Sequence, residues 1–134
     1  MLNKITIIGN VGKNPEIRTT KTGKEIANFS VATSKSWKDQ DGQKQTKTSW
    51  HRVSVFGGLV NIVKSYVKAG TKLYLEGEME YGEYEKDGHK NYTATIILSG
   101  FNSNLILLGS KEDKPQMSQQ DSNALDNLED EIPF

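Results

Sequence analysis

The sequence has no cysteine and only two histidines, and these absences narrow its possible chemistry. Without cysteine, the 134-residue chain has no disulfide, no thiolate metal site and no cysteine nucleophile. His51 and His89 do not form the HxxxH or HxxE spacing of a metal site, and neither common glycine-rich phosphate loop occurs. We therefore expect a protein without a metal ion, a cofactor or an enzymatic activity.

Long apolar runs are also lacking. The longest early run, residues 5–8, is interrupted by Thr6 and is too short for a signal peptide or a membrane span. The length suits one domain with an appendage. These features predict a cytoplasmic protein with no membrane partner.

The zero net charge of the chain conceals a split between two segments. Residues 1–110 contain 15 lysines and arginines against 10 aspartates and glutamates, which is a net charge of +5. Residues 111–134 contain 2 lysines against 7 acidic residues, which is a net charge of −5. A basic body joined to an acidic tail suggests a polyanionic ligand for the body, although a charge of +5 permits nucleic-acid binding without requiring it.

The body shows the alternation of β-strands, with one short helix. The expected strands are residues 4–8, 25–36, 46–56, 72–84, 92–98 and 104–108. Leu59, Ile62, Val63 and Tyr66 have helical spacing between the third and fourth strands, and residues 86–89 form a hairpin signal. This order of five or six strands with one helix predicts an all-β OB-fold, a five-stranded Greek-key barrel with one short helix, over residues 1–110.

The C-terminal segment divides into two parts. Residues 111–125 are rich in polar residues and predict a disordered linker. Residues 126–134 combine four carboxylate side chains with the end Ile132-Pro133-Phe134, which would offer a negative collar and an apolar plug to a basic-rimmed pocket. This segment predicts a protein-interaction motif; the alternative is a solvated tail that only aids solubility.

The third expected strand contains the main candidates for a binding site. Alternation puts Trp50, Arg52, Ser54 and Phe56 on one face, and His51, Val53 and Val55 on the other. Aromatic rings can stack on nucleobases with little sequence preference, while arginine contacts phosphate. Trp50 and Phe56 could instead belong to the core.

Further aromatic residues lie next to cations. Trp37, expected in the loop after the second strand, is flanked by Lys35 and Lys38, and Tyr84 lies near Lys86 and Lys90. Cations can hold phosphates while rings hold bases, so together these residues predict one surface for single-stranded nucleic acid. The predicted DNA-binding residues are Trp37, Trp50, Phe56, Tyr84, Arg52, Lys35, Lys38 and Lys86.

Several segments of the chain carry a family resemblance. They are residues 3–12, 15–18, 32–37, 50–53 and 56–57, together with the acidic Ile-Pro-Phe end. In these segments the chain resembles the bacterial single-stranded DNA-binding protein (SSB) family. The resemblance covers residues 1–110 as a domain and 126–134 as a motif, and leaves only the linker unmatched.

This resemblance implies an OB-fold that assembles as a homotetramer, wraps single-stranded DNA and takes part in replication, recombination and repair in the nucleoid. It assigns base stacking to Trp37, Trp50, Phe56 and Tyr84, where the last position is usually tryptophan in the family. It places His51 toward the subunit interface. It also implies that the tail recruits partner proteins of these processes through Asp130, Glu131, Ile132, Pro133 and Phe134. One departure is the hairpin at residues 78–85, which is acidic where relatives often carry basic residues.

Two other functions are compatible with parts of the sequence. The acidic hairpin and the modest charge of the body fit a barrel that binds protein or RNA as an adaptor. A metal-dependent nuclease would use Glu76, Glu78 and Glu80, which share one side of a strand. These glutamates are better explained as a solvated sheet edge that discourages aggregation.

Overall fold

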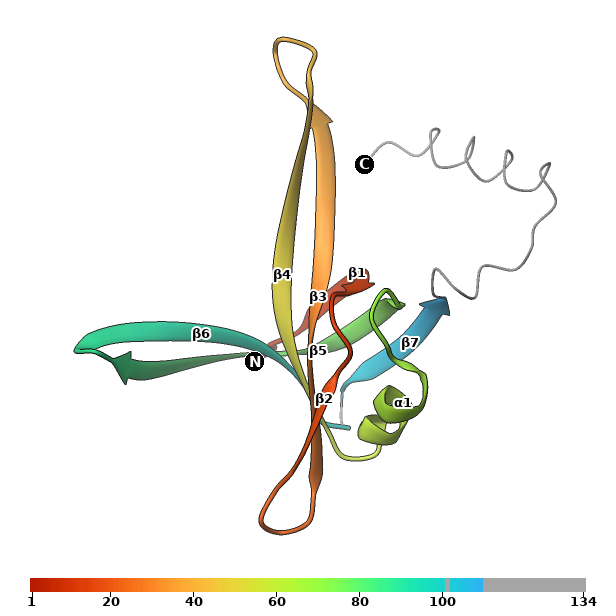
Figure 1. The fold of residues 1–134 in the computed structure, drawn as a ribbon, viewed down its shortest axis with the longest axis vertical. Coiled ribbons are helices and arrows are strands. Elements are labelled where there is room, and N and C mark those ends of the chain that lie inside the picture. The colour runs from red at the N-terminus through yellow and green to blue at the C-terminus, as the bar shows by residue number, and fades with distance from the viewer. Residues whose placement is uncertain (101, 110–134) are drawn as a thin grey trace, which may run out of the picture.

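Seven strands and one helix make up the part of the chain that the structure, a computed structural model, describes: residues 1–100 and 102–109 (Figure 1). Five of the strands close into a barrel in the order β1-β3-β4-β6-β5, with β5 pairing back to β1. The elements are β1 (Ile5–Val11), β2 (Glu16–Thr19), β3 (Glu25–Lys38), β4 (Lys44–Phe56), α1 (Leu59–Tyr66), β5 (Lys72–Lys86), β6 (His89–Leu98) and β7 (Asn104–Gly109).

Pairing registers show how the ring closes. β1 pairs antiparallel with both β3 and β5, whereas β4 pairs parallel with β6, where Arg52 lies opposite Thr95. β2 and β7 lie outside the ring, against β3 and β5 respectively. Closure leaves the barrel strands few free edges. The predicted OB-fold with its single short helix is confirmed.

The core fills the barrel with side chains from alternate positions of each strand. Val31, Val55, Leu73, Leu75 and Leu98 are completely buried. Burial of such a side chain stabilises the fold by about 1.5–3 kcal/mol. The inward positions therefore fix which side of each strand faces outward.

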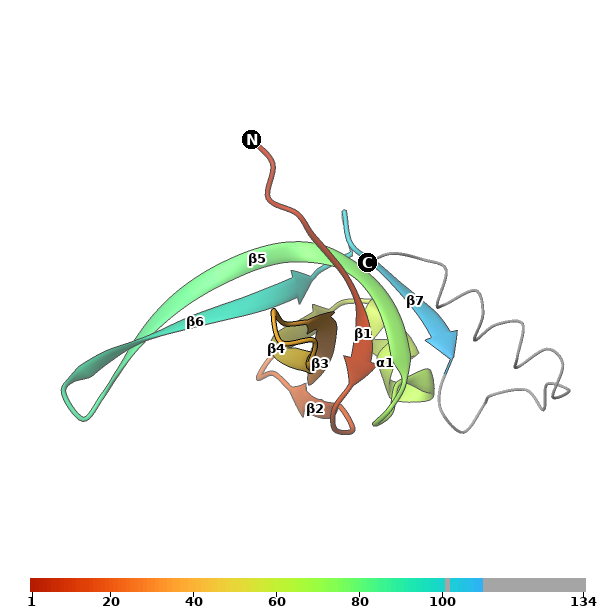
Figure 2. The same ribbon diagram turned by 90° about the horizontal axis from the view of Figure 1, so that it is seen from above.

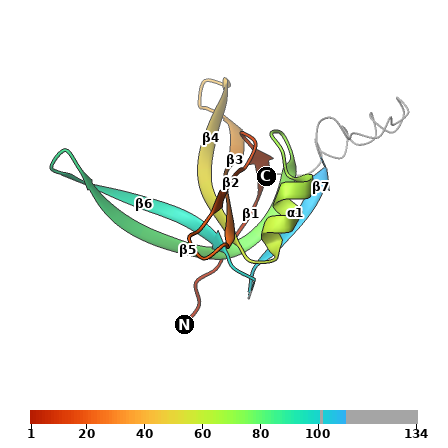
Figure 3. The ribbon, with the colours of Figure 1, turned by 60° about the horizontal axis from the view of Figure 1, so that its bottom comes forward.

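Helix α1 covers one end of the core (Figure 3). It covers the four residues with helical spacing, but it buries Val60 and Val63, whereas Tyr66, which the spacing places on its apolar face, is exposed. No helix in the described residues is long and apolar enough to cross a membrane.

Two hairpins extend beyond the barrel in different directions (Figures 1 and 2). One is formed by β3 and β4, and the other by β5 and β6. Strands β3, β4 and β5 have 14, 13 and 15 residues, more than the 3–10 typical of globular proteins. Asp87 and Gly88 at the β5–β6 turn have φ angles of 55° and 78°, as a type I′ turn requires, so the predicted hairpin is confirmed.

The fold differs from the sequence prediction at two places. The pattern does not predict β2, because all four of its residues are exposed and it has no buried face. Trp37 lies within β3 rather than in a loop, since β3 and β4 stay paired as far as Lys38 and Lys44. Both faces of this overhang meet solvent, which removes the apolar alternation that would indicate a strand.

The linker at residues 111–125 and the motif at residues 126–134 lie outside the described residues, so their predicted roles stay predictions.

Candidate nucleic-acid interface

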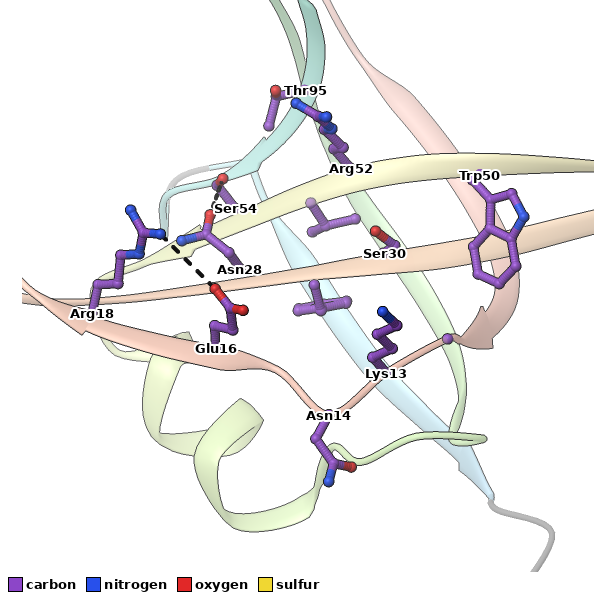
Figure 4. Close-up of a pocket in the computed structure, with 13 residues that line it drawn as sticks. Lys13, Asn14, Glu16, Arg18, Asn28, Ser30, Trp50, Arg52, Ser54 and Thr95 are labelled. Carbon is purple, nitrogen blue, oxygen red and sulfur yellow. Dashed lines mark hydrogen bonds and ion pairs between the residues drawn. The ribbon is translucent and has the colours of Figure 1, made fainter.

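A groove of about 860 Å³ runs across the outer surface of the barrel (Figure 4). Its walls come from the loop after β1, from β2, and from β3, β4 and β6. The lining residues are Gly12, Lys13, Asn14, Glu16, Arg18, Asn28, Phe29, Ser30, Trp50, Arg52, Val53, Ser54 and Thr95.

Trp50 is the exposed aromatic side chain among the residues that line this groove. It lies on the outer face of β4 and 62% of its surface is exposed, so it is not a core residue. Its ring packs against the backbone of Gly12, where an added Cβ would lie only 2.5 Å from the ring atom Cζ3. A glycine at position 12 is therefore what allows the ring to lie there.

Three cations line the groove together with Trp50. Arg52 follows Trp50 on the same face of β4, and Lys13 and Arg18 come from the loop after β1 and from β2. The groove contains one carboxylate, Glu16, whose Oε2 is 4.0 Å from an Arg18 nitrogen. The lining is therefore net positive and suits an anion.

Lys13 and Arg18 are functional candidates that the sequence reasoning missed. Lys13 precedes the unpredicted strand β2 and Arg18 lies within it, so nothing in the alternation places them in the groove of Trp50. The family resemblance at residues 3–12 and 15–18 was the available signal.

Small polar side chains form the rest of the floor. Ser54 Oγ donates a hydrogen bond of 2.6 Å to Asn28 Oδ1, and Ser30 and Thr95 lie beside Arg52 (Figure 4). These groups offer hydrogen bonds without large side chains, which leaves space above the floor for a flat ring.

Tyr84 and Lys86 lie on the same outer face, but farther along the β5–β6 hairpin. The pairing of the strands connects the groove with this hairpin. Arg52 of β4 lies opposite Thr95 of β6, and Thr95 lies opposite Glu80 of β5. Tyr84 is exposed and occupies the outer face four residues beyond Glu80. The structure thus places Tyr84 on a continuation of the surface that holds Trp50.

Phe56 lies in a second groove, of about 710 Å³, at the other end of β4. It is half-buried and neighbours Lys24 and Thr20 of the β2–β3 turn. It lies on the same face of β4 as Trp50 and Arg52, as alternation predicts, but it lines a separate depression.

Trp37 lies on the opposite side of the β3–β4 hairpin from Trp50. Paired residues of two strands point to the same face. Trp37 pairs with Gln45, and Trp50 pairs with Ala32. Ala32 and Trp37 lie an odd number of positions apart on β3, so the two tryptophan rings point to opposite faces. Lys35 Nζ lies 5.8 Å from the centre of the Trp37 ring, within cation–π range. The structure does not bring Trp37 and Lys35 into the groove, and Lys38 lies at the hairpin tip.

His51 lies on the inner side of β4, half-buried, and is hydrogen-bonded through Nε2 to Thr33 Oγ1 at 2.8 Å. Its orientation away from Trp50 agrees with the alternation, while its predicted interface role stays a prediction.

The three glutamates of β5 do not form a metal site. The Tyr74 hydroxyl donates to Glu76, and Lys4 Nζ is 3.2 Å from its other oxygen; these contacts, the tyrosine's first, hold the pKa of Glu76 below its usual value. The same hydrogen bond raises the pKa of Tyr74. No group of three or more His, Cys, Asp and Glu in residues 1–100 and 102–109 is arranged to hold a metal ion.

The interpretation of these glutamates as a sheet edge is wrong for Glu76, which lies between β1 and β7. At Glu78 and Glu80, β5 pairs with β6 alone, so one side of the strand lacks a strand partner in the described chain.

An OB barrel with an exposed tryptophan and several cations along one groove is typical of proteins that bind single-stranded nucleic acid. Residues 2–105 match the model of the single-strand binding protein family. The chain belongs to this family, which confirms the resemblance found in its sequence and, since these are binding proteins rather than enzymes, its non-enzymatic character.

Relatives are similar over most of the chain. A single-stranded DNA-binding protein of Rickettsia felis is 43% identical over 99% of this chain and 97% of the relative. One of Rhizobium meliloti is 44% identical over 82% of this chain and 65% of the relative. Among solved structures, a Plasmodium falciparum SSB complex with single-stranded DNA has a TM-score of 0.75 and 33% identity, covering 81% of this chain and 96% of that one.

Proposed function

We propose that the protein binds and protects single-stranded DNA with little sequence preference. The observation that carries this proposal is the exposed ring of Trp50 beside Arg52 in a net-positive groove, on a barrel of the single-strand binding protein family. A buried ring or an acidic groove on the same fold would not support it.

The chemistry divides between two kinds of side chain. Trp50 stacks on a base, which contributes about 1–3 kcal/mol for each stacked base regardless of its identity. Lys13, Arg18 and Arg52 contact phosphates, and the counterions they release make the affinity depend on salt. The protein changes no covalent bond; it holds the strand and shields it.

A longer strand would follow the outer surface in both directions from Trp50. Toward the β5–β6 hairpin it meets Tyr84 and Lys86, and toward the other end of β4 it meets Phe56. Trp37, Lys35 and Lys38 add contacts where the strand passes around the β3–β4 hairpin.

We also propose that the chain assembles as a homo-oligomer, in keeping with the tetramer that the family resemblance implies. Ile8, Tyr74 and Ile106 lie in one row across β1, β5 and β7 on the outer face. Ile8 is 52% and Ile106 46% exposed in the single chain. Apolar side chains gathered on a sheet face favour contact with a second copy. His51 is assigned to a subunit contact by the resemblance.

The C-terminal motif completes the proposal. Asp130, Glu131, Ile132, Pro133 and Phe134 recruit partner proteins of replication, recombination and repair, through a negative collar and an apolar end. These roles place the protein in the cytoplasm, associated with the nucleoid.

Replacement of Trp50 tests the stacking. Trp50→Ala should weaken binding to a short oligo(dT) by about 1–3 kcal/mol, roughly five- to 150-fold, when measured by fluorescence anisotropy of a labelled strand. Tyr66→Ala is the matched control, since Tyr66 is also exposed but lies on α1, outside both grooves. Equal affinity of the two variants would contradict the assigned role of Trp50.

A further inference from the structure

The wall of the groove that carries Lys13 is the loop between β1 and β2, residues 12–15. Lys13 lines the groove, and its ammonium group forms no ion pair within residues 1–100 and 102–109. An exposed loop has many backbone conformations, and fixing one of them when a ligand binds costs free energy. The contribution of Lys13 to binding therefore depends on how firmly the backbone of this loop is held beforehand.

A tight turn lies beside this loop and is itself anchored in the core. The turn, residues 68–71, joins α1 to β5 and is closed by a hydrogen bond of 3.1 Å from Thr71 N to Lys68 O. Gly70 has a φ angle of 86°, as the third residue of a type II turn requires. Val67, just before the turn, and Thr71, at its end, are only 7% and 3% exposed. The turn therefore offers a fixed support to its neighbours.

The two central amides of this turn bond to the β1–β2 loop and its start. The closing hydrogen bond of a β-turn does not use the N–H groups of its two middle residues. Gly70 N donates to Val11 O at 2.8 Å. Ala69 N donates to the side chain of Asn14, at Oδ1, also at 2.8 Å. Val11 precedes Lys13 and Asn14 follows it, so the segment that carries the lysine is clamped on both sides.

Asn14 and Lys13 point to opposite sides of the loop. Figure 4 shows the amide of Asn14 directed away from Trp50 and Arg52, toward the turn, and the lysine directed into the groove. Pro15 favours this arrangement, because a residue before proline is restricted to extended backbone, in which neighbouring side chains alternate. The Asn14 amide therefore acts on the groove through the backbone of its neighbour rather than by contact.

We propose that Asn14 is a positioning residue for single-strand binding. On the proposed function, which this inference deepens, its hydrogen bond with Ala69 holds Lys13 where the ammonium group meets a phosphate of the strand in the groove. Because this bond forms on folding, the loop needs little further ordering when DNA arrives. Asn14 then raises both the affinity and its salt dependence without carrying a charge itself.

Removal of the amide tests this role. Asn14→Ala should weaken binding of a short oligo(dT) about threefold at low salt, the size of one exposed ion pair, and should flatten the salt dependence toward that of Lys13→Ala. Loss of one phosphate contact lowers the slope by roughly 0.7, whereas loss of a neutral contact leaves it unchanged. The measurement is fluorescence anisotropy of a labelled strand over a range of salt concentrations. An unchanged slope would overturn the proposal, whatever the affinity.

A double-mutant cycle identifies the group through which Asn14 acts. In the Lys13→Ala background, Asn14→Ala should cause almost no further loss of affinity, because the ammonium group that the amide positions is already gone. Two losses that multiply, as they do for independent sites, would overturn the proposal.

Asn3→Ala is the matched control for the loss of a structural amide. The Asn3 side chain also bonds to a distant main chain, donating to Met79 O at 2.8 Å and accepting from Met79 N at 3.1 Å, but it lies outside both grooves. This variant should keep the affinity and the salt slope of the parent protein. An equal change in Asn3→Ala and Asn14→Ala would overturn the proposal, because the effect would then follow stability. Failure of the parent protein to bind oligo(dT) would instead contradict the proposed function.

Discussion

At the scale of residues, the interface depends on how one exposed ring is held. Trp50 has a largely solvent-exposed surface, yet one side of its ring lies against Gly12. This neighbour restricts the ring before DNA arrives, which reduces the conformational entropy that stacking would otherwise cost. On the proposed function, Gly12 therefore contributes to the interface although it offers no side chain.

The replacement Gly12→Ala should displace the ring. The added Cβ would lie 2.5 Å from Trp50 Cζ3, and the exposed indole can rotate away more easily than the backbone can move. We expect oligo(dT) affinity to fall about tenfold, with a changed Trp50 emission and little change in melting temperature. Gly58→Ala is the control, since nothing lies within 4 Å of a Cβ at this position. Unchanged affinity in Gly12→Ala would show that the ring pose does not matter.

Single residues were predictable where one face of a strand is buried. Val53 and Val55 are apolar and alternate with Arg52 and Ser54, so the outward direction of Trp50 follows from its position relative to them. Trp37 lies beyond the buried part of β3, where the sequence contains no such reference. Trp37 has the parity of Phe29 and Val31, so its side follows once β3 is known to extend to Lys38, and the sequence does not show that extension.

At the scale of elements, the turns decide where the long hairpins end. Asp39 closes the β3–β4 turn: its Oδ1 accepts hydrogen bonds from the backbone nitrogens of Gln43 and Asp41 at 2.8 and 3.0 Å, and its Oδ2 accepts one from Gln45. These bonds, that of Gln43 first, hold the pKa of Asp39 below its usual value.

The order of this turn should therefore depend on pH. A lowered pKa means that the stabilisation is complete above the ordinary aspartate value of about 3.9, and that it is lost as the pH falls through the lower value of the folded state. Amide exchange at Gln43, followed by NMR, should accelerate in Asp39→Ala at neutral pH. Asp41→Ala is the control, because its side chain makes no hydrogen bond found in the described residues. Equal exchange rates in both variants would contradict this account.

The element order was predictable because most strands have one buried face. β2 has none, and the tips of the two hairpins have none either, so their extent came only from the structure. The acidic hairpin was visible in the sequence as a charge pattern. Alternation divides its carboxylates between two faces, Glu78 and Glu80 on one and Glu83 and Glu85 on the other. Which of these faces adjoins the groove required the register of β5 with β6.

At the scale of the whole molecule, the barrel presents different chemistry on different sides. The groove side is polar and cationic, whereas the outer face of β1, β5 and β7 is apolar around Ile8, Tyr74 and Ile106. This apolar face was hidden in the sequence, because the neighbours Ile7 and Ile8 put apolar side chains on both sides of β1 and alternation disappears there.

Charges on the apolar face should prevent assembly. Ile8→Glu with Ile106→Glu places carboxylates where a second copy would bury apolar surface, so the mass measured by light scattering should fall from about four chains to one or two. Ile17→Glu is the control, since Ile17 is an exposed isoleucine on β2, away from this face. An unchanged mass in the double variant would place the subunit contact elsewhere.

The most direct test of single-strand binding is a tryptophan-fluorescence titration with oligo(dT) and with a duplex, at two salt concentrations. Strong quenching by the single strand, weak quenching by the duplex, and an affinity that falls with salt, with a slope of roughly −0.7 per phosphate contacted, are predicted. Absence of quenching, or equal quenching by both nucleic acids, would contradict stacking on Trp50 and the function derived from it.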